Sequence, residues 1–250
     1  MKKLILAFGL ILSMGANAHP VDEPRVVIEP LGTGHYLAGE IQYDFQLFDT
    51  VAKKPIAEID LNESHTKKLH FISYDAALQE FSHVHPTFNG KIWHVTLQLP
   101  VNGKYFFWAQ GELADKTEFS TFVDAMVMNG KPENQVIPVG DIRQAVDRST
   151  QVELDKTTIK AGQMTMINFK ISRTDGIDPV ITPYLGEFAH LIATPADGDE
   201  LTHVHPMAGG KPNTGMIHAT FEKEGDYRIW VQLMDHAELK TIALSVTVLK

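Results

Sequence analysis

Hydrophobic and polar residues alternate along many short segments of this chain. In residues 93–99 (WHVTLQL) every second side chain is apolar, and residues 217–221 (IHATF) repeat the pattern. Alternation with a period of two is typical of β-strands that bury one face. Turn sequences such as NGK, EGD and ADGD separate these segments. Since no long segment has helical periodicity, the pattern predicts an all-β fold of antiparallel strands.

The chain also contains a long internal repeat. Residues 68–86 align with residues 188–206 without a gap, and 8 of the 19 positions are identical. Further along, GKYFFWAQ (103–110) aligns with GDYRIWVQ (225–232). A repeat of about 100 residues is a whole domain, because solenoid repeats are usually 20–50 residues long.

This duplication predicts the domain organisation. We expect two tandem antiparallel β-sandwiches, immunoglobulin-like or cupredoxin-like, related by an internal duplication. The first module is predicted at residues 25–128 and the second at residues 148–250. Residues 129–147 are rich in turn-forming residues and are predicted to be a linker.

Residues 1–18 have the features of a secretory signal peptide. Two lysines precede an apolar stretch from Leu4 to Met14, and Ala16, Asn17 and Ala18 form an A-x-A cleavage site. The apolar stretch is too short to cross a bilayer core of about 30 Å. We therefore expect cleavage after Ala18, a periplasmic or secreted bacterial protein, and no membrane span in the mature chain.

Composition narrows the classes of partner. The formal net charge is −9 at pH 7 and the sequence contains no cysteine. An acidic chain attracts cations and is repelled by the phosphate backbone, so we expect no nucleic-acid partner. The absence of cysteine excludes disulfides, thiolate metal sites and a lipidated cysteine.

Three histidines recur in each copy with the spacing H-x12-H-x-H-P. They are His70, His83 and His85 in the first copy, and His190, His203 and His205 in the second. On a strand, side chains at positions i and i+2 point to one face about 6.6 Å apart. Two such imidazoles can bind one ion at about 2.0–2.1 Å each, with a third supplied by a neighbouring strand. The pattern therefore favours one copper or zinc site per copy.

The sequence leaves a second interpretation of these histidines open. All six share strand faces with apolar residues, so they could instead be hydrogen-bonded histidines that close the end of a core. His94 and His218 fall on the polar faces of their strands, and we expect both to face solvent. The Met-x-Met pairs at 126–128 and 164–166 have thioethers suited to Cu(I), although core packing is the favoured interpretation.

Cleavage after Ala18 would create a seventh candidate ligand. His19 would become the first residue, and its amine and imidazole could chelate one copper ion. Pro20 has no N–H, so the backbone cannot supply a deprotonated amide at that position. The alternative is an incidental start to a frayed chain end.

The repeated unit combines Ala-Gly, a strand, the H…HVHP motif and G-x-Y-x-x-W-x-Q. This unit resembles bacterial secreted β-sandwich modules with a His…His-x-His-Pro signature that occur in heavy-metal-handling contexts. The His-Pro start is similar to that of periplasmic copper-resistance carriers. These resemblances imply that the protein handles metal ions and meets another periplasmic or membrane metal-handling protein.

The functional hypothesis is a periplasmic or secreted protein that binds copper or zinc for buffering, transport or resistance. Two alternatives remain: a structural or adhesive sandwich protein with core histidines, and a copper- or zinc-dependent enzyme. The sequence has no Gly-x-Ser-x-Gly, P-loop, dinucleotide-binding or His-Glu-x-x-His motif. A non-enzymatic binding protein is therefore the expectation.

Overall fold

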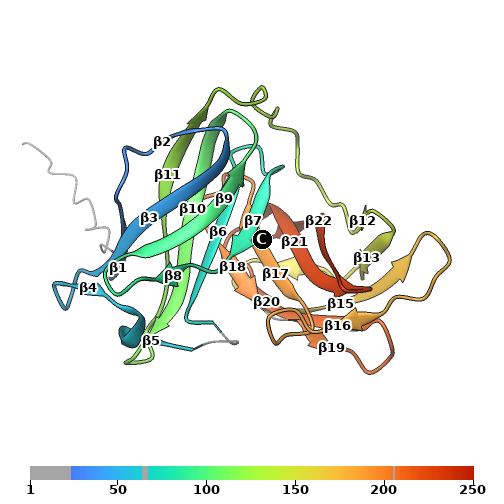
Figure 1. Cartoon of the computed structure of the whole chain (residues 1–250). Coiled ribbons are helices and arrows are strands. Elements are labelled where there is room, and N and C mark those ends of the chain that lie inside the picture. Colours follow the sequence, from blue (N-terminus) through green and yellow to red (C-terminus); the bar gives the residue numbers. More distant parts are fainter. Residues whose placement is uncertain (1–23, 64–66, 205) are drawn as a thin grey trace, which may run out of the picture.

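The computed structural model describes residues 24–63, 67–204 and 206–250. Within these residues the chain is built of β-strands, with a single 3-10 turn at Glu58–Asp60. The strands form two β-sandwiches that lie side by side (Figure 1). The predicted all-β fold with two sandwiches is confirmed. The predicted signal peptide and His19 lie outside the described residues.

The first sandwich contains two mainly antiparallel sheets. Its strands are β1 (Val26–Pro30), β2 (His35–Leu37), β3 (Gly39–Asp49), β4 (Lys54–Ile56), β5 (Leu61–Asn62), β6 (Leu69–Asp75), β7 (Phe81–Val84), β8 (Thr87–Phe88), β9 (Trp93–Leu99), β10 (Gly103–Leu113) and β11 (Glu118–Met128). One sheet has the order β1-β3-β9-β8, with β4 also paired to β3. The other has the order β2-β11-β10-β6-β7, with β5 also paired to β10.

The second sandwich repeats this arrangement. Its strands are β12 (Gln144–Asp147), β13 (Thr150–Leu154), β14 (Ile159–Lys160), β15 (Met164–Arg173), β16 (Ile181–Thr182), β17 (His190–Pro195), β18 (Thr202–Val204), β19 (Met207–Ala208), β20 (Thr214–Thr220), β21 (Gly225–Asp235) and β22 (Glu238–Leu249). The sheet orders are β12-β13-β15-β20-β19 and β14-β22-β21-β17-β18, with β16 paired to β21. Strands β10, β6 and β7 of the first copy thus correspond to β21, β17 and β18 of the second.

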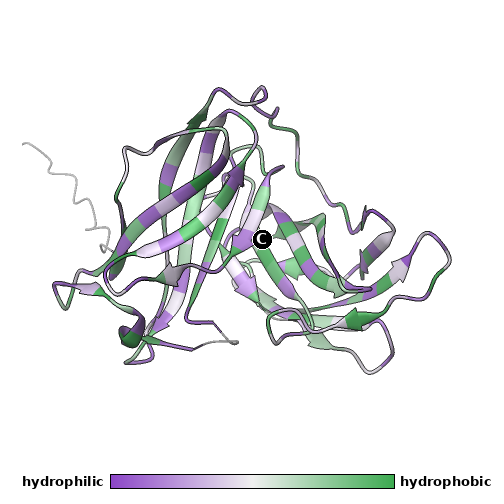
Figure 2. Cartoon of the chain, in the orientation of Figure 1, coloured by the Kyte–Doolittle hydropathy of each residue, from purple (hydrophilic) through white to green (hydrophobic). Residues whose placement is uncertain are grey.

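Alternating side chains fill a separate core in each sandwich. Figure 2 shows hydrophobic and hydrophilic positions alternating along the strands of both copies. In β9 the buried residues are Trp93, Val95, Leu97 and Leu99, while the side chains between them are exposed or half-buried. This is the geometry that the period-two pattern predicts, because successive side chains point to opposite faces.

The segment predicted as a linker is partly strand. β12 pairs with β13 in register from Gln144↔Glu153 to Asp147↔Thr150. Ala145 packs against the core of the second sandwich. The short alternation at 144–147 therefore adds an edge strand that the turn-rich composition of the segment concealed.

A third core cluster joins the two sandwiches. It combines Ile72, Tyr74 and Trp108 from the first copy with Ile192 and Trp230 from the second. The Tyr74 ring stacks on Trp230 with centroids 5.5 Å apart, and its hydroxyl donates to the Gly198 carbonyl at 2.9 Å. The six-stranded sheets therefore face each other, and strands β6 and β17 are buried on both faces.

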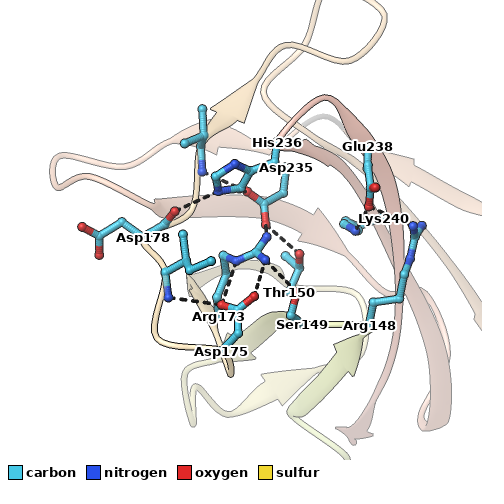
Figure 3. A network of polar contacts seen from close by, with 12 residues as sticks. Arg148, Ser149, Thr150, Arg173, Asp175, Asp178, Asp235, His236, Glu238 and Lys240 are labelled. Atoms are coloured by element: carbon cyan, nitrogen blue, oxygen red, sulfur yellow. Dashed lines mark hydrogen bonds and ion pairs between the residues drawn. The ribbon is translucent and has the colours of Figure 1, made fainter.

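A buried ion pair holds one end of the second sandwich (Figure 3). Asp235, at the end of β21, accepts hydrogen bonds from Arg173 Nη1 at 2.9 Å and Thr150 Oγ1 at 2.7 Å. The backbone N–H of Val180 donates to its other oxygen at 2.9 Å. Arg173 also pairs with Asp175. Both oxygens of the buried carboxylate are thus satisfied by donors from different strands and loops.

Across the three described stretches of chain, no helix has the length and apolar character required to span a membrane.

Candidate metal centre

The repeated histidines lie on the strands that face the other sandwich. His70 is on β6 and His83 on the adjacent strand β7, where His83 pairs with Ile72. In the second copy, His203 on β18 pairs with Ile192 on β17, the strand that begins at His190. The predicted pairing of the His-x-His strand with the strand that carries the upstream histidine, His70 or His190, is confirmed. β7 and β18 end at Val84 and Val204, just before the His-Pro steps.

In the first copy, three imidazole nitrogens converge. His70 Nδ1 lies 3.1 Å from His83 Nε2 and 3.3 Å from His85 Nε2. Two nitrogens bound to a tetrahedral ion at about 2.0–2.1 Å stand about 3.3 Å apart. The observed separations therefore match those of ligands that share one ion.

The second copy repeats the contact with the same atoms. His190 Nδ1 lies 3.5 Å from His203 Nε2. His190 is completely buried, and His203 is half-buried. His205, the remaining histidine of this motif, lies outside the described residues.

The two motifs form one cluster. The ring centroid of His203 lies 4.9 Å from that of His70 and 5.1 Å from that of His83. Two triads have ligand atoms within 4.8 Å of one another: one is His70, His83 and His85, and the other is His83, His190 and His203. The first triad is the predicted site of the first copy, whereas the predicted site of the second copy includes His205, which lies outside the described residues. Because His83 belongs to both triads, it joins the two motifs at the interface.

Hydrogen bonds fix the tautomers of two of these histidines. His83 Nδ1 lies 3.0 Å from Gln232 Oε1, and His190 Nε2 lies 3.0 Å from the Tyr184 carbonyl oxygen. Because both oxygens can only accept, these ring nitrogens donate. In the neutral ring, the nitrogen turned toward the cluster then carries the lone pair that a metal ion needs.

Two glutamines hold equivalent positions beside the cluster. Gln110 pairs across the sheet with His70, and Gln232 with His190. Gln232 Nε2 donates to Thr241 Oγ1 at 3.1 Å, and Gln110 Nε2 donates to Ser120 Oγ at 3.0 Å. Gln110 Oε1 is buried and accepts no hydrogen bond from the described residues. The repeated G-x-Y-x-x-W-x-Q segment aligns these glutamines in the sequence, but no motif there assigns them a role.

Burial keeps the imidazoles of His83 and His85 uncharged. Desolvation, reinforced by the neighbouring His70, His85 and His190, lowers the pKa of His83 well below its usual value. Desolvation, together with His70 and Lys67, lowers the pKa of His85 to about 3. At neutral pH these rings carry no competing proton, so they are ready to coordinate a cation.

Cavities adjoin the cluster on two sides. One of about 530 Å³ is lined by His70, His203 and Gln110 together with Glu112, Glu118 and Glu222. Another of about 420 Å³ includes His83, His85, His94 and Tyr184 in its lining. The glutamates give the first cavity an acidic lining, which attracts cations.

The remaining candidates belong to neither triad. His218 is exposed, as expected. His94 is half-buried, with Nδ1 2.6 Å from the Asp44 carboxylate. The methionines of both Met-x-Met pairs are 40–78% exposed, so their predicted core packing is wrong. Each of these side chains alternates with buried residues on its strand and therefore points outward.

Comparisons with known proteins add little about function. Residues 144–250 match a family described as a domain of unknown function, DUF8832. No curated protein sequence matches the chain.

Solved structures with some likeness include three multidomain fragments. The fibronectin(III)-like modules of Clostridium thermocellum CbhA are 14% identical, with a TM-score of 0.25 over 90% of this chain and 94% of that one. Invasin, a bacterial integrin-binding protein, is 16% identical, with a TM-score of 0.26 over 89% of this chain and 39% of that one. The FN1–FN3 domains of chicken CNTN1 are 10% identical, with a TM-score of 0.24 over 91% and 68%. At these scores, function must be argued from the site itself.

Proposed function

We propose that this protein binds a divalent transition-metal ion, copper or zinc, at a single histidine centre shared by its two sandwiches. One observation carries the proposal: imidazole nitrogens converge at separations of 3.1–3.5 Å within each copy, and His83 of the first copy has a ligand atom within 4.8 Å of those of His190 and His203. The separations within each copy are close to those of nitrogen ligands on one tetrahedral ion. The role that follows is buffering, transport or resistance in the periplasm or outside the cell, without catalysis.

The contacts of His70 favour a metal ion over a purely hydrogen-bonded cluster. Its Nδ1 faces two nitrogens at once, those of His83 and His85. A ring nitrogen has either one hydrogen or one lone pair in the ring plane, so it cannot form good hydrogen bonds with both. A cation between the three rings would satisfy all three lone pairs together.

The donor set also limits the choice of ion. Imidazole nitrogens suit copper and zinc, whereas calcium and magnesium prefer oxygen ligands. For a given nitrogen site, affinity rises from Zn(II) to Cu(II), so in a competition at equal free concentration copper displaces zinc. The glutamate-lined cavity beside His70 and His203 supplies an entry route for either cation.

A structural role is the second candidate, because hydrogen bonds cross the interface at this point. His83 on the first sandwich bonds to Gln232 on the second. On this alternative, the cluster fastens the two sandwiches together, as in a structural or adhesive protein, and needs no ion. Replacing His83 would then lower the stability of the metal-free protein without any effect of added metal.

Calorimetric titration of untagged protein with Zn(II) and Cu(II), in a buffer that does not chelate metals, separates the two. The proposal expects saturable uptake by the parent and its loss in His83→Ala, since His83 belongs to both triads. His94→Ala is the matched control, because His94 hydrogen-bonds Asp44 and belongs to neither triad. A parent without saturable uptake of either ion would contradict the metal proposal.

A further inference from the structure

Four methionines and a histidine gather on the outer face of the second sandwich. Met164 and Met166 project from β15, and Met166 lies directly opposite His218 on β20. Met216, two residues before His218, pairs with Asn168 on one side and with Met207 of β19 on the other. These five residues lie in adjacent strands of one sheet, and we call them the methionine patch.

The patch is open to solvent. Met164 is 78% exposed, Met166 52% and Met207 49%. His218 is exposed and forms no hydrogen bond or ion pair with the described residues, whereas Met216 is half-buried. Side chains directly opposite across a strand pair have Cβ atoms about 4.5–5.5 Å apart, and diagonal neighbours about 7–8 Å. Met166, Met216 and His218 are mutual neighbours of these kinds, and flexible methionine side chains can close such gaps around one ion. Met164 lies opposite Thr220, four residues along the sheet from Met216, and stands at the edge of this group.

The equivalent face of the first sandwich carries different chemistry. Strand registers match Met166 and His218 with Asp44 and His94 of the first copy. There, the Asp44 carboxylate occupies His94 Nδ1 at 2.6 Å. In place of Met164 the first copy has Gln42, which hydrogen-bonds Thr96 at 2.8 Å.

The two copies therefore differ in the chemistry of this sheet face. A polar sheet surface with paired side chains in one copy corresponds to exposed thioethers in the other. Exposed methionines gain nothing from core packing, which is the usual reason for methionine in a sandwich. The difference points to a ligand that prefers sulfur.

We propose that the methionine patch binds a soft monovalent cation, Cu(I) or Ag(I), through Met166, Met216 and His218, with Met164 and Met207 at its edges. Thioether and imidazole ligands select Cu(I), whereas Zn(II) gains little from thioethers. This site is separate from the histidine centre between the sandwiches and does not depend on it. The protein would then hold copper in its reduced form at the surface.

Methionine-methyl NMR tests this proposal on the full chain. Seven methionines follow residue 24, and their ¹³C-labelled methyl signals can be assigned with single Met→Leu variants. Adding one equivalent of Ag(I), in chloride-free buffer, is expected to shift the signals of Met166 and Met216. Those of Met126, Met128 and Met234 should stay in place, and Zn(II) should move none of the seven.

Two double variants sharpen the result. Met166→Leu with His218→Ala should abolish the silver-induced shift of Met216, whereas Met126→Leu with Met128→Leu should leave it intact. All four positions are at least partly exposed, so both variants are expected to fold. His83→Ala should keep the full silver response even if it loses zinc binding. Unmoved patch signals, or equal shifts at Met126 and Met128, would overturn the proposal.

Discussion

The Arg173–Asp235 network and the histidine centre both bury polar side chains, but they satisfy them in different ways. Around Asp235, an arginine, a hydroxyl and a backbone N–H all donate to one carboxylate (Figure 3). Burial alone would raise the pKa of Asp235, but hydrogen bonds from Thr150, Val180 and Arg173 lower it below its ordinary value. The charge is compensated within the fold.

At the histidine centre, the polar groups are oriented without being compensated in this way. Gln232 and the Tyr184 carbonyl each accept a hydrogen bond from one ring nitrogen, of His83 and His190 respectively. The other nitrogen of each ring then directs a lone pair at the cluster. Burial then lowers the pKa of His83 and His85, which disfavours protonation of those lone pairs. The first cluster thus stabilises the fold by itself, whereas the second has the arrangement that the proposed metal binding requires.

The largest effect is expected from breaking the ion pair. Asp235→Ala leaves Arg173 its pair with Asp175 but removes the buried acceptor of Thr150 and Val180. The free energy of unfolding should fall by about 1–3 kcal/mol for each buried donor left unsatisfied. Urea unfolding of the variant and the parent measures this loss. Added Zn(II) should leave the size of the loss unchanged, because Asp235 belongs to neither histidine triad.

Metal should stabilise the parent through the histidine centre. A ligand that binds only the folded state contributes RT ln(1 + [L]/Kd), about 2.7 kcal/mol at a hundredfold excess over Kd. Thermal unfolding with and without Zn(II) should therefore show a higher melting temperature for the parent and for His94→Ala. His83→Ala should show no such rise. If it retains the full rise, His83 is not a ligand.

Gln232, which hydrogen-bonds His83, should affect the affinity for the metal ion. Gln232→Leu removes the acceptor that fixes the His83 tautomer, and losses of this kind typically weaken metal binding about 10–100-fold. Calorimetry with Zn(II) gives the change in Kd. An unchanged Kd would mean that the His83–Gln232 hydrogen bond does not position a ligand.

The two clusters should respond to acid in different pH windows. Since the pKa values of His83 and His85 are lowered in the folded state, protons bind preferentially to the unfolded chain below its histidine pKa near 6.5. Stability of the metal-free protein should thus fall as pH drops from about 6.5 toward the folded pKa of His85, about 3. Asp235, with a lowered pKa, contributes stability that is lost only below about pH 4. Replacing His83 and His85 by alanine should flatten the profile between pH 5 and 7.

Much of the fold could be predicted from local pattern. Alternation in segments such as 93–99 identified the strands, and the gapless repeat identified two copies of one sandwich. Pairing of the His-x-His strand with the strand carrying His70 also followed, because adjacent motifs in a small sandwich usually pair. The strand at 144–147 was missed because its four residues lie among turn-forming neighbours.

The union of the two motifs in one centre could not be derived from either motif alone. It depends on how the sandwiches pack, which local periodicity does not specify. A signal was present in β6 and β17, whose runs LHFIS and HLIAT are more continuously apolar than a half-buried strand requires. Such runs indicate burial on both faces, and therefore a partner sheet against the side chains of His70 and His190.

Native mass spectrometry with Zn(II) tests the shared centre most directly, because it counts ions on each folded chain. Since both triads need His83, the parent should bind one tightly held zinc ion, and His83→Ala should bind none. His70→Ala and His190→Ala should each weaken the binding of this same zinc ion. Two zinc ions per parent chain, each removed by substitutions in only one copy, would contradict a shared centre.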